Sequence, residues 1–261
     1  MKIIAHENIF IRSLRPSRAE ADIWFIHGFG ESGLSFREAF DSPLAKNFRL
    51  FAPDFPGFGV SPFQSRRGSL RGSTRLLGEL IDQFSKGRPI LLVAHSLGGI
   101  VGTWTVQERP KQVRAYISIE GNLTRSDTFF SGLAAKAKSA GKFYHFFKGQ
   151  ILAKAKGHEE LERYFASLRF ADPRALIAWG RSGVEATGLD RSGEEFAGLT
   201  CRKIYFWGEE SMAHRSREFL RDKDIDHRCF KKCGHWPMIE KPKECYEAIS
   251  EWLVRPRSLS E

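Results

Sequence analysis

The chain has little cysteine for its length and no long apolar run. In 261 residues there are four cysteines, Cys201, Cys229, Cys233 and Cys245, which suit reduced, buried thiols better than a disulfide framework. No apolar stretch approaches the roughly 20 residues of a membrane-spanning helix. The first twelve residues alternate like a strand and lack the apolar centre of a signal peptide. These absences predict a cytoplasmic protein with no membrane span.

Signals for a metal site or for nucleic-acid binding are equally sparse. Cys229 and Cys233 have a loose metal-like spacing, but Cys229 falls in an expected strand, so we expect no metal and no organic cofactor. The net charge is +10, from 41 Lys and Arg against 31 Asp and Glu. Its densest part, residues 121–158, has seven Lys or Arg and a single acid, Asp127. Since no nucleic-acid motif accompanies it, this stretch indicates a solvated basic face that could also attract an anionic small molecule.

Strand-like and helix-like stretches alternate along most of the chain. This pattern predicts an α/β protein, with a mostly parallel central sheet and helices on both of its faces. The expected strands are residues 8–14, 23–27, 50–53, 89–94, 113–120, 202–207 and 227–231, and the clearest helices are 70–84, 97–108 and 243–254.

Residues 122–198 break this alternation. They are helix-like throughout, rich in aromatic residues, and much longer than a crossover connection requires. We therefore expect a core domain of residues 1–121 and 199–261, with a helical cap at 122–198. The cap should lie over the carboxyl edge of the sheet, where open α/β folds bind ligands.

The most informative motif is an apolar strand that runs directly into Ser96. Ala94 and Gly98, two residues before and after it, are small enough for the sharp strand-to-helix turn called a nucleophile elbow. Such a turn raises the serine Oγ above the sheet and strains its backbone. It also places the N–H of Leu97 at a helix N-terminus, where it can stabilise an oxyanion.

Two further loops carry groups that a nucleophilic serine needs. The strand at 23–27 ends in a glycine-rich loop, and we expect the backbone N–H of Phe29 in it to be the second oxyanion donor. His235 follows Gly234 between the last strand and the last helix, 139 residues after Ser96. A histidine at that edge of the sheet can reach the elbow serine and accept its proton.

Together these motifs resemble the α/β-hydrolase fold superfamily, in particular the members with a helical cap inserted after the sixth strand. The resemblance covers essentially the whole chain. The segments that carry it are His27-Gly28-Phe29-Gly30, Ala94-His95-Ser96-Leu97-Gly98-Gly99, Gly234-His235-Trp236-Pro237 and the loop of residues 54–61. In that loop, Asp54 is expected to be structural and to cap a tight turn.

The third member of the expected triad departs from the family pattern. Family members usually carry an Asp three residues past the Gly that ends the seventh strand, and here that position is Ser211. Glu210 stands one residue earlier. Glu120, at the end of an apolar strand, is the favoured candidate, because some relatives place their acid there and a buried carboxylate needs a partner such as His235. Glu210 remains the alternative acid.

The resemblance implies a serine-dependent hydrolase, esterase-like (EC 3.1.1), that acts on esters, thioesters or lactones through an acyl-enzyme. Its partner would be a small acyl substrate, for which an anionic group remains open. Carbon–carbon bond hydrolysis, acyl transfer and elimination by the same triad are alternatives, and so is non-catalytic binding of a small molecule. Four other histidines show no spacing that indicates a role beyond a structural or surface one: His95, His145, His158 and His214.

Overall fold

The computed structural model describes residues 1–254; residues 255–261, the end of the expected core range, lie outside the described part. Its centre is an eight-stranded sheet in the order β1-β2-β4-β3-β5-β6-β7-β8. The pairs β1–β2 and β2–β4 are antiparallel, and every other pair is parallel. The strands are β1 (Lys2–His6), β2 (Ile9–Leu14), β3 (Ala21–Ile26), β4 (Phe48–Pro53), β5 (Ile90–His95), β6 (Val113–Ile119), β7 (Arg202–Gly208) and β8 (His227–Phe230).

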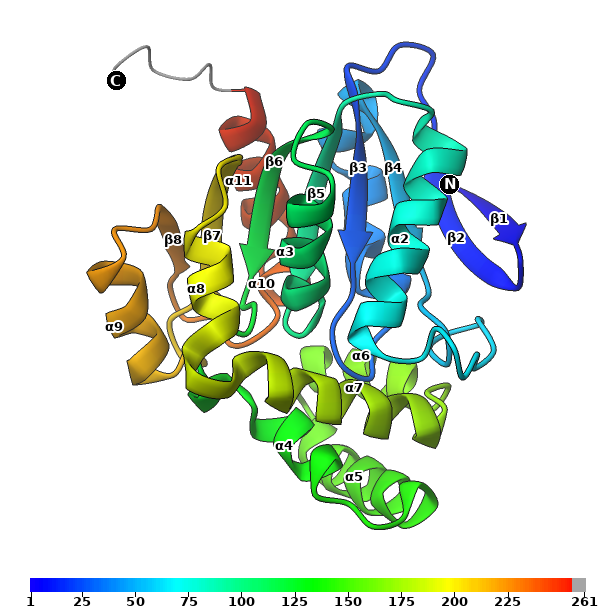
Figure 1. Cartoon of the computed structure of the whole chain (residues 1–261), viewed down its shortest axis with the longest axis vertical. Coiled ribbons are helices and arrows are strands. Elements are labelled where there is room, and N and C mark those ends of the chain that lie inside the picture. The colour runs from blue at the N-terminus through cyan, green and yellow to red at the C-terminus, as the bar shows by residue number, and fades with distance from the viewer. Residues whose placement is uncertain (255–261) are drawn as a thin grey trace.

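Helices cover both faces of this sheet, which explains why its middle strands are apolar along their whole length. All six residues of β3 and all six of β5 are buried. Figure 1 shows α2, α3 and α8 in front of the sheet and α11 behind it. The core helices are η1 (Gly33–Asp41), α1 (Leu44–Asn47), α2 (Leu70–Ser85), α3 (Gly98–Glu108), α9 (His214–Asp222), α10 (Pro237–Glu240) and α11 (Pro242–Val254). The expected fold class, an α/β-hydrolase architecture, is confirmed.

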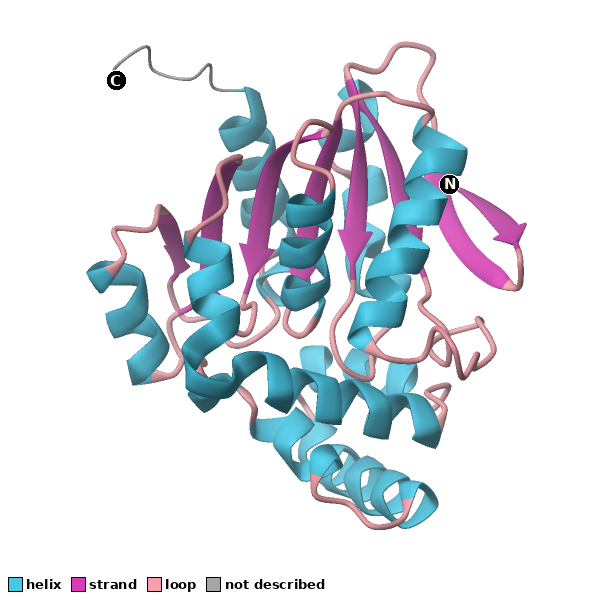
Figure 2. Ribbon diagram, viewed as in Figure 1, coloured by secondary structure: helices cyan, strands magenta, loops and turns pink. Residues whose placement is uncertain are grey.

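A helical insertion separates β6 from β7. It consists of η2 (Arg125–Asp127), α4 (Phe129–Ala135), α5 (Ala140–Ala155), α6 (Glu159–Leu168), α7 (Pro173–Thr187), η3 (Gly188–Asp190) and α8 (Arg191–Ala197). Most of these helices lie across the end of the sheet at which the arrowheads of β3, β5 and β6 point (Figure 2). The insertion therefore covers the carboxyl edge of the parallel strands, the edge where the sequence motifs converge.

Aromatic side chains join the insertion to the core. Trp179 of α7 is fully buried and stacks on His27, with ring centroids 5.6 Å apart. The Trp179 ring also meets Phe58 at 4.8 Å. From α6, the hydroxyl of Tyr164 donates a 2.9 Å hydrogen bond to the carbonyl of Phe29. Among residues 1–254, no helix is both long and apolar enough to cross a bilayer.

Candidate active site

Ser96 occupies a strained backbone conformation between β5 and α3. Its φ is +52°, in the left-handed region that favours glycine, and its N–H donates to the carbonyl of Ile119 at 3.0 Å. The small neighbours are sterically required. A Cβ on Gly98 would lie 2.5 Å from the His27 carbonyl oxygen, and one on Gly28 would lie 2.9 Å from the Cβ of Ser96. The structure therefore has the geometry of an elbow, as the sequence predicts.

Two backbone N–H groups beside Ser96 remain available to a ligand. Within residues 1–254, neither the N–H of Phe29 nor that of Leu97 donates a hydrogen bond. The loop that carries Phe29 is held from below by His27, whose Nδ1–H donates to the Gly28 carbonyl at 2.9 Å. The Nε2 of His27 accepts from the N–H of Phe55 at 3.0 Å. Burial lowers the pKa of His27, which keeps this ring neutral and suits one donor and one acceptor nitrogen.

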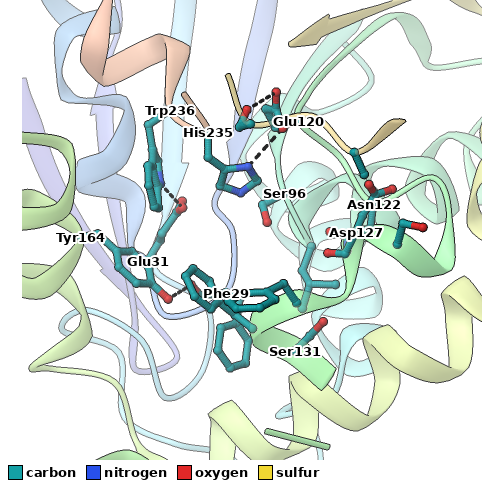
Figure 3. Close-up of a pocket in the computed structure, with 16 residues that line it drawn as sticks. Phe29, Glu31, Ser96, Glu120, Asn122, Asp127, Ser131, Tyr164, His235 and Trp236 are labelled. Carbon is teal, nitrogen blue, oxygen red and sulfur yellow. Dashed lines mark hydrogen bonds and ion pairs between the residues drawn. The ribbon is translucent and has the colours of Figure 1, made fainter. Parts of the chain in front are cut away.

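His235 faces a buried carboxylate from another strand. Its Nδ1 lies 3.2 Å from Oε2 of Glu120, which follows β6 directly. Figure 3 shows the imidazole between Glu120 and Ser96. Burial by itself lowers the pKa of His235, but the hydrogen bond to Glu120 and its negative charge outweigh that effect and raise the pKa above its usual value. The pair is thus arranged to hold one tautomer of His235 and to stabilise its protonated form.

The structure brings Glu120, and not Glu210, to His235. Glu120 is 6 % exposed, and its Oε1 accepts hydrogen bonds from the Gly208 N–H at 2.7 Å and from the Ser211 hydroxyl at 2.9 Å. Ser211, the residue at the family's usual acid position, therefore anchors the carboxylate that comes from the neighbouring strand. Glu210 is exposed and does not line the pocket around Ser96.

A cavity of about 260 Å³ connects these groups to the insertion. The insertion contributes Phe129, Phe130 and Tyr164 to its lining. The core contributes all of the favoured site residues of the sequence analysis: Phe29, Ser96, Leu97, Glu120 and His235. Among residues 1–254, three carboxylates line it, those of Glu31, Glu120 and Asp127, and no Lys or Arg does. Burial and the charge of Glu120 raise the pKa of Asp127. The basic stretch in the sequence therefore does not supply cations to this cavity.

Nothing in the described part of the chain forms a cluster of three His, Cys, Asp or Glu side chains able to hold a metal ion. All four cysteines are free.

One part of the site escapes the sequence analysis. Glu31, which lines the cavity, and the buried His95 form a pair 2.8 Å apart, and the indole N–H of Trp236 donates to the same carboxylate at 2.8 Å. His95 carries no spacing signal. The one available signal is Glu31 itself, a carboxylate in a glycine-rich loop that follows a buried strand.

Comparison with known proteins finds esterases among the distant sequence relatives. The chain is 24 % identical over 246 residues to the pimeloyl-[acyl-carrier protein] methyl ester esterase of Aeromonas salmonicida, a match that covers 87 % of this chain and 93 % of that protein. It is 27 % identical over 110 residues to a putative esterase/lipase of Mycoplasma pneumoniae, which covers 42 % of this chain and 41 % of that protein.

Solved structures show the same fold. The N-acyl homoserine lactonase AidH superposes with a TM-score of 0.77 at 18 % identity, which covers 100 % of this chain and 98 % of the lactonase. A thermophilic esterase from Thermogutta terrifontis gives 0.73 at 17 % identity, with 94 % and 92 % covered. The model of the alpha/beta hydrolase family matches residues 25–248, which is most of the chain and includes every motif described above. This chain belongs to the alpha/beta hydrolase family.

Proposed function

We propose that the protein is a serine hydrolase that cleaves carboxylic esters, thioesters or lactones through an acyl-enzyme. The observation that carries the proposal is the left-handed backbone of Ser96 beside a histidine whose Nδ1 faces a buried carboxylate. A serine hydroxyl is a weak nucleophile until a positioned base accepts its proton. The esterase and lactonase relatives support this reaction class.

The reaction would proceed in two steps. Nε2 of His235 accepts the Ser96 proton as Oγ attacks the carbonyl carbon, and the resulting oxyanion is bound by the N–H groups of Phe29 and Leu97. Glu120 stabilises the imidazolium. His235 then donates that proton to the leaving oxygen or sulfur. A water, deprotonated by the same histidine, attacks the acyl-enzyme and releases the acid and Ser96.

The cavity favours a substrate without negative charge. Of the described side chains that line it, three are carboxylates and none is a Lys or Arg, so a carboxylate or phosphate near the acyl group would meet repulsion. The lysines of residues 128–158 are mostly exposed on the outer side of the segment proposed as the cap, residues 122–198. An anionic group on the acyl substrate, which the sequence leaves open, is therefore disfavoured. The proposed substrate is a neutral acyl compound that contacts the aromatic side chains of Phe129, Phe130 and Tyr164.

Labelling with a fluorophosphonate probe tests the proposal. The probe phosphonylates a serine only when a base and an oxyanion hole activate it, so an adduct mapped to Ser96 by mass spectrometry is the expected result. Ser96→Ala should abolish the adduct, and the exposed Ser65→Ala should not change it. Absence of an adduct on the wild-type protein, with the cavity open to small ligands, would point to non-catalytic binding instead.

A further inference from the structure

A buried carboxylate lies at the meeting point of the loops that carry the proposed catalytic groups. Glu31 is 2 % exposed. Its Oε2 accepts from the N–H of Gly28 at 2.9 Å, and its Oε1 accepts from the indole N–H of Trp236 at 2.8 Å. The same Oε1 lies 2.8 Å from Nδ1 of His95. Figure 3 shows Glu31 pointing toward Trp236, below the His235 ring.

His95 continues this connection toward His235. Its side chain is fully buried, and its Nε2 lies 2.7 Å from the backbone carbonyl oxygen of His235. The two imidazole centroids are 4.8 Å apart. The two ring nitrogens of His95 therefore lie against two different loops, Nδ1 beside the Glu31 carboxylate and Nε2 beside the His235 carbonyl.

The ionisation of Glu31 agrees with this geometry. Burial by itself would raise the pKa of Glu31, but the charge and hydrogen bond of His95, together with two further donors, lower it to about 2. An ionised carboxylate accepts several hydrogen bonds and donates none, which matches the Gly28 and Trp236 N–H donors and the His95 ring beside it. Breaking such a pair leaves an uncompensated buried charge.

Each segment that the pair joins carries one proposed catalytic group. Gly28 is followed directly by Phe29, the proposed oxyanion donor, and His95 is followed directly by Ser96. The His235 carbonyl and the Trp236 indole belong to the loop that carries the proposed general base. We propose that Glu31 and His95 are a positioning pair, which fixes His235 and the oxyanion loop relative to Ser96. Neither residue touches the substrate's reacting atoms in this role. The inference rests on the proposed function. Glu120 contacts the side chain of His235, and the Glu31–His95 pair would constrain the backbone of the same residue.

Glu31→Gln tests the proposal, because an amide cannot replace the carboxylate here. One amide oxygen can accept from one side, while its NH₂ group must then face another donor. We expect kcat, corrected for the titrated active-site concentration, to fall by about 10- to 100-fold with KM changed by less than about twofold, since a displacement of roughly 1 Å at the base has effects of that size. Trp236→Phe, which removes one donor and keeps a ring, should give a smaller fall in kcat.

Asp22→Asn is the matched control. Asp22 is fully buried and pairs with Arg49 at 2.9 Å and Arg88 at 3.2 Å, at the opposite end of β3 from Ser96. Its loss should lower the melting temperature and leave kcat near the wild-type value. If Glu31→Gln and Trp236→Phe lower only the melting temperature, or if Asp22→Asn lowers kcat equally, the pair has a merely structural role and the proposal is wrong.

A readout without substrate separates this inference from the proposed function. The Nδ1–H of His235, hydrogen-bonded to Glu120, should give a far-downfield proton resonance in NMR spectra of the wild-type protein. We expect Glu31→Gln to shift or broaden it and Asp22→Asn to leave it in place. An unchanged resonance in Glu31→Gln would overturn the positioning role. A missing fluorophosphonate adduct on wild-type Ser96, with the resonance responding as expected, would overturn the proposed function alone.

Discussion

The carboxyl edge of the sheet and the helical insertion above it are held together in different ways. At the edge, buried polar groups bond across distant segments: Glu120 to Gly208 and Ser211, and Glu31 to Trp236. In the insertion, aromatic rings carry many of the contacts. Phe147 lies 5.1 Å from Phe130, 5.3 Å from Phe143 and 6.3 Å from Tyr164. Tyr164 in turn lies 6.1 Å from Phe130 and 5.3 Å from Trp236.

The two kinds of contact constrain different properties. A hydrogen bond is directional, and one wrong atom leaves a buried group unpaired, so the edge fixes positions atom by atom. Aromatic packing tolerates changes of shape at similar volume, so the insertion fixes the size and polarity of a cavity. Substitutions at the edge should therefore affect the chemical step, and those in the insertion should affect the choice of substrate.

Ser96→Ala should have the largest effect. Removing the nucleophile should lower kcat/KM for a neutral ester by about 10³-fold or more, because only binding and the oxyanion donors remain. The melting temperature should stay the same or rise. In the described structure the Ser96 hydroxyl makes no hydrogen bond, so the substitution by alanine removes none. Steady-state kinetics on p-nitrophenyl esters measures the loss, with the exposed Ser65→Ala as the control. Turnover retained by Ser96→Ala would exclude the acyl-enzyme.

Glu120→Gln should come next and should decide between the two acids. The amide keeps the size of the side chain but no longer stabilises the imidazolium, so kcat should fall by roughly 10²- to 10⁴-fold. Glu210→Gln should leave kcat within about twofold, because Glu210 is exposed and does not line the cavity. The reverse ranking of these two variants would show that the loop after β7 supplies the acid.

The pH profile of kcat/KM should show a smaller, measurable consequence of the same pair. His235 accepts a proton only when it is neutral, and its pKa is raised by Glu120, so activity should fall as the pH drops through a midpoint above 6.5. In Glu120→Gln the raising charge is gone, and the midpoint should move to lower pH. A midpoint that is identical in both proteins would mean that another group controls this limb.

The difference between edge and insertion also explains how much the sequence predicts. The elbow at Ser96, the loop at Phe29 and the strand that ends in Glu120 follow from local patterns: small residues at set offsets and an apolar run ending in a carboxylate. Glu31 and His95 could not be found in this way, because their bond joins segments that only the sheet order β3–β5 brings together. Short helices such as α10 (Pro237–Glu240) carry too few residues to show a period.

For the insertion, the sequence predicts helices and aromatic packing but not which rings face the substrate. Phe130 lines the cavity and stacks on Tyr164 at 6.1 Å, whereas Phe146 is 57 % exposed and does not line the cavity. Nothing in their spacing distinguishes the two. The described structure separates them, because α5 buries Phe143, Phe147 and Ile151 and leaves Phe146 on its outer side.

Phe130→Ala should therefore give the smallest effect and test the insertion directly. Removing the ring enlarges the cavity and takes away part of its apolar wall, so the ratio of kcat/KM between long and short acyl chains should change by a few-fold, about 1 kcal/mol of discrimination. The kcat for a short ester should change little, because no contact of Ser96, His235 or Glu120 is lost. Phe146→Ala should leave the chain-length profile unchanged. A fall in kcat that is equal for every chain length would mean that the insertion, like the edge, fixes the chemical step.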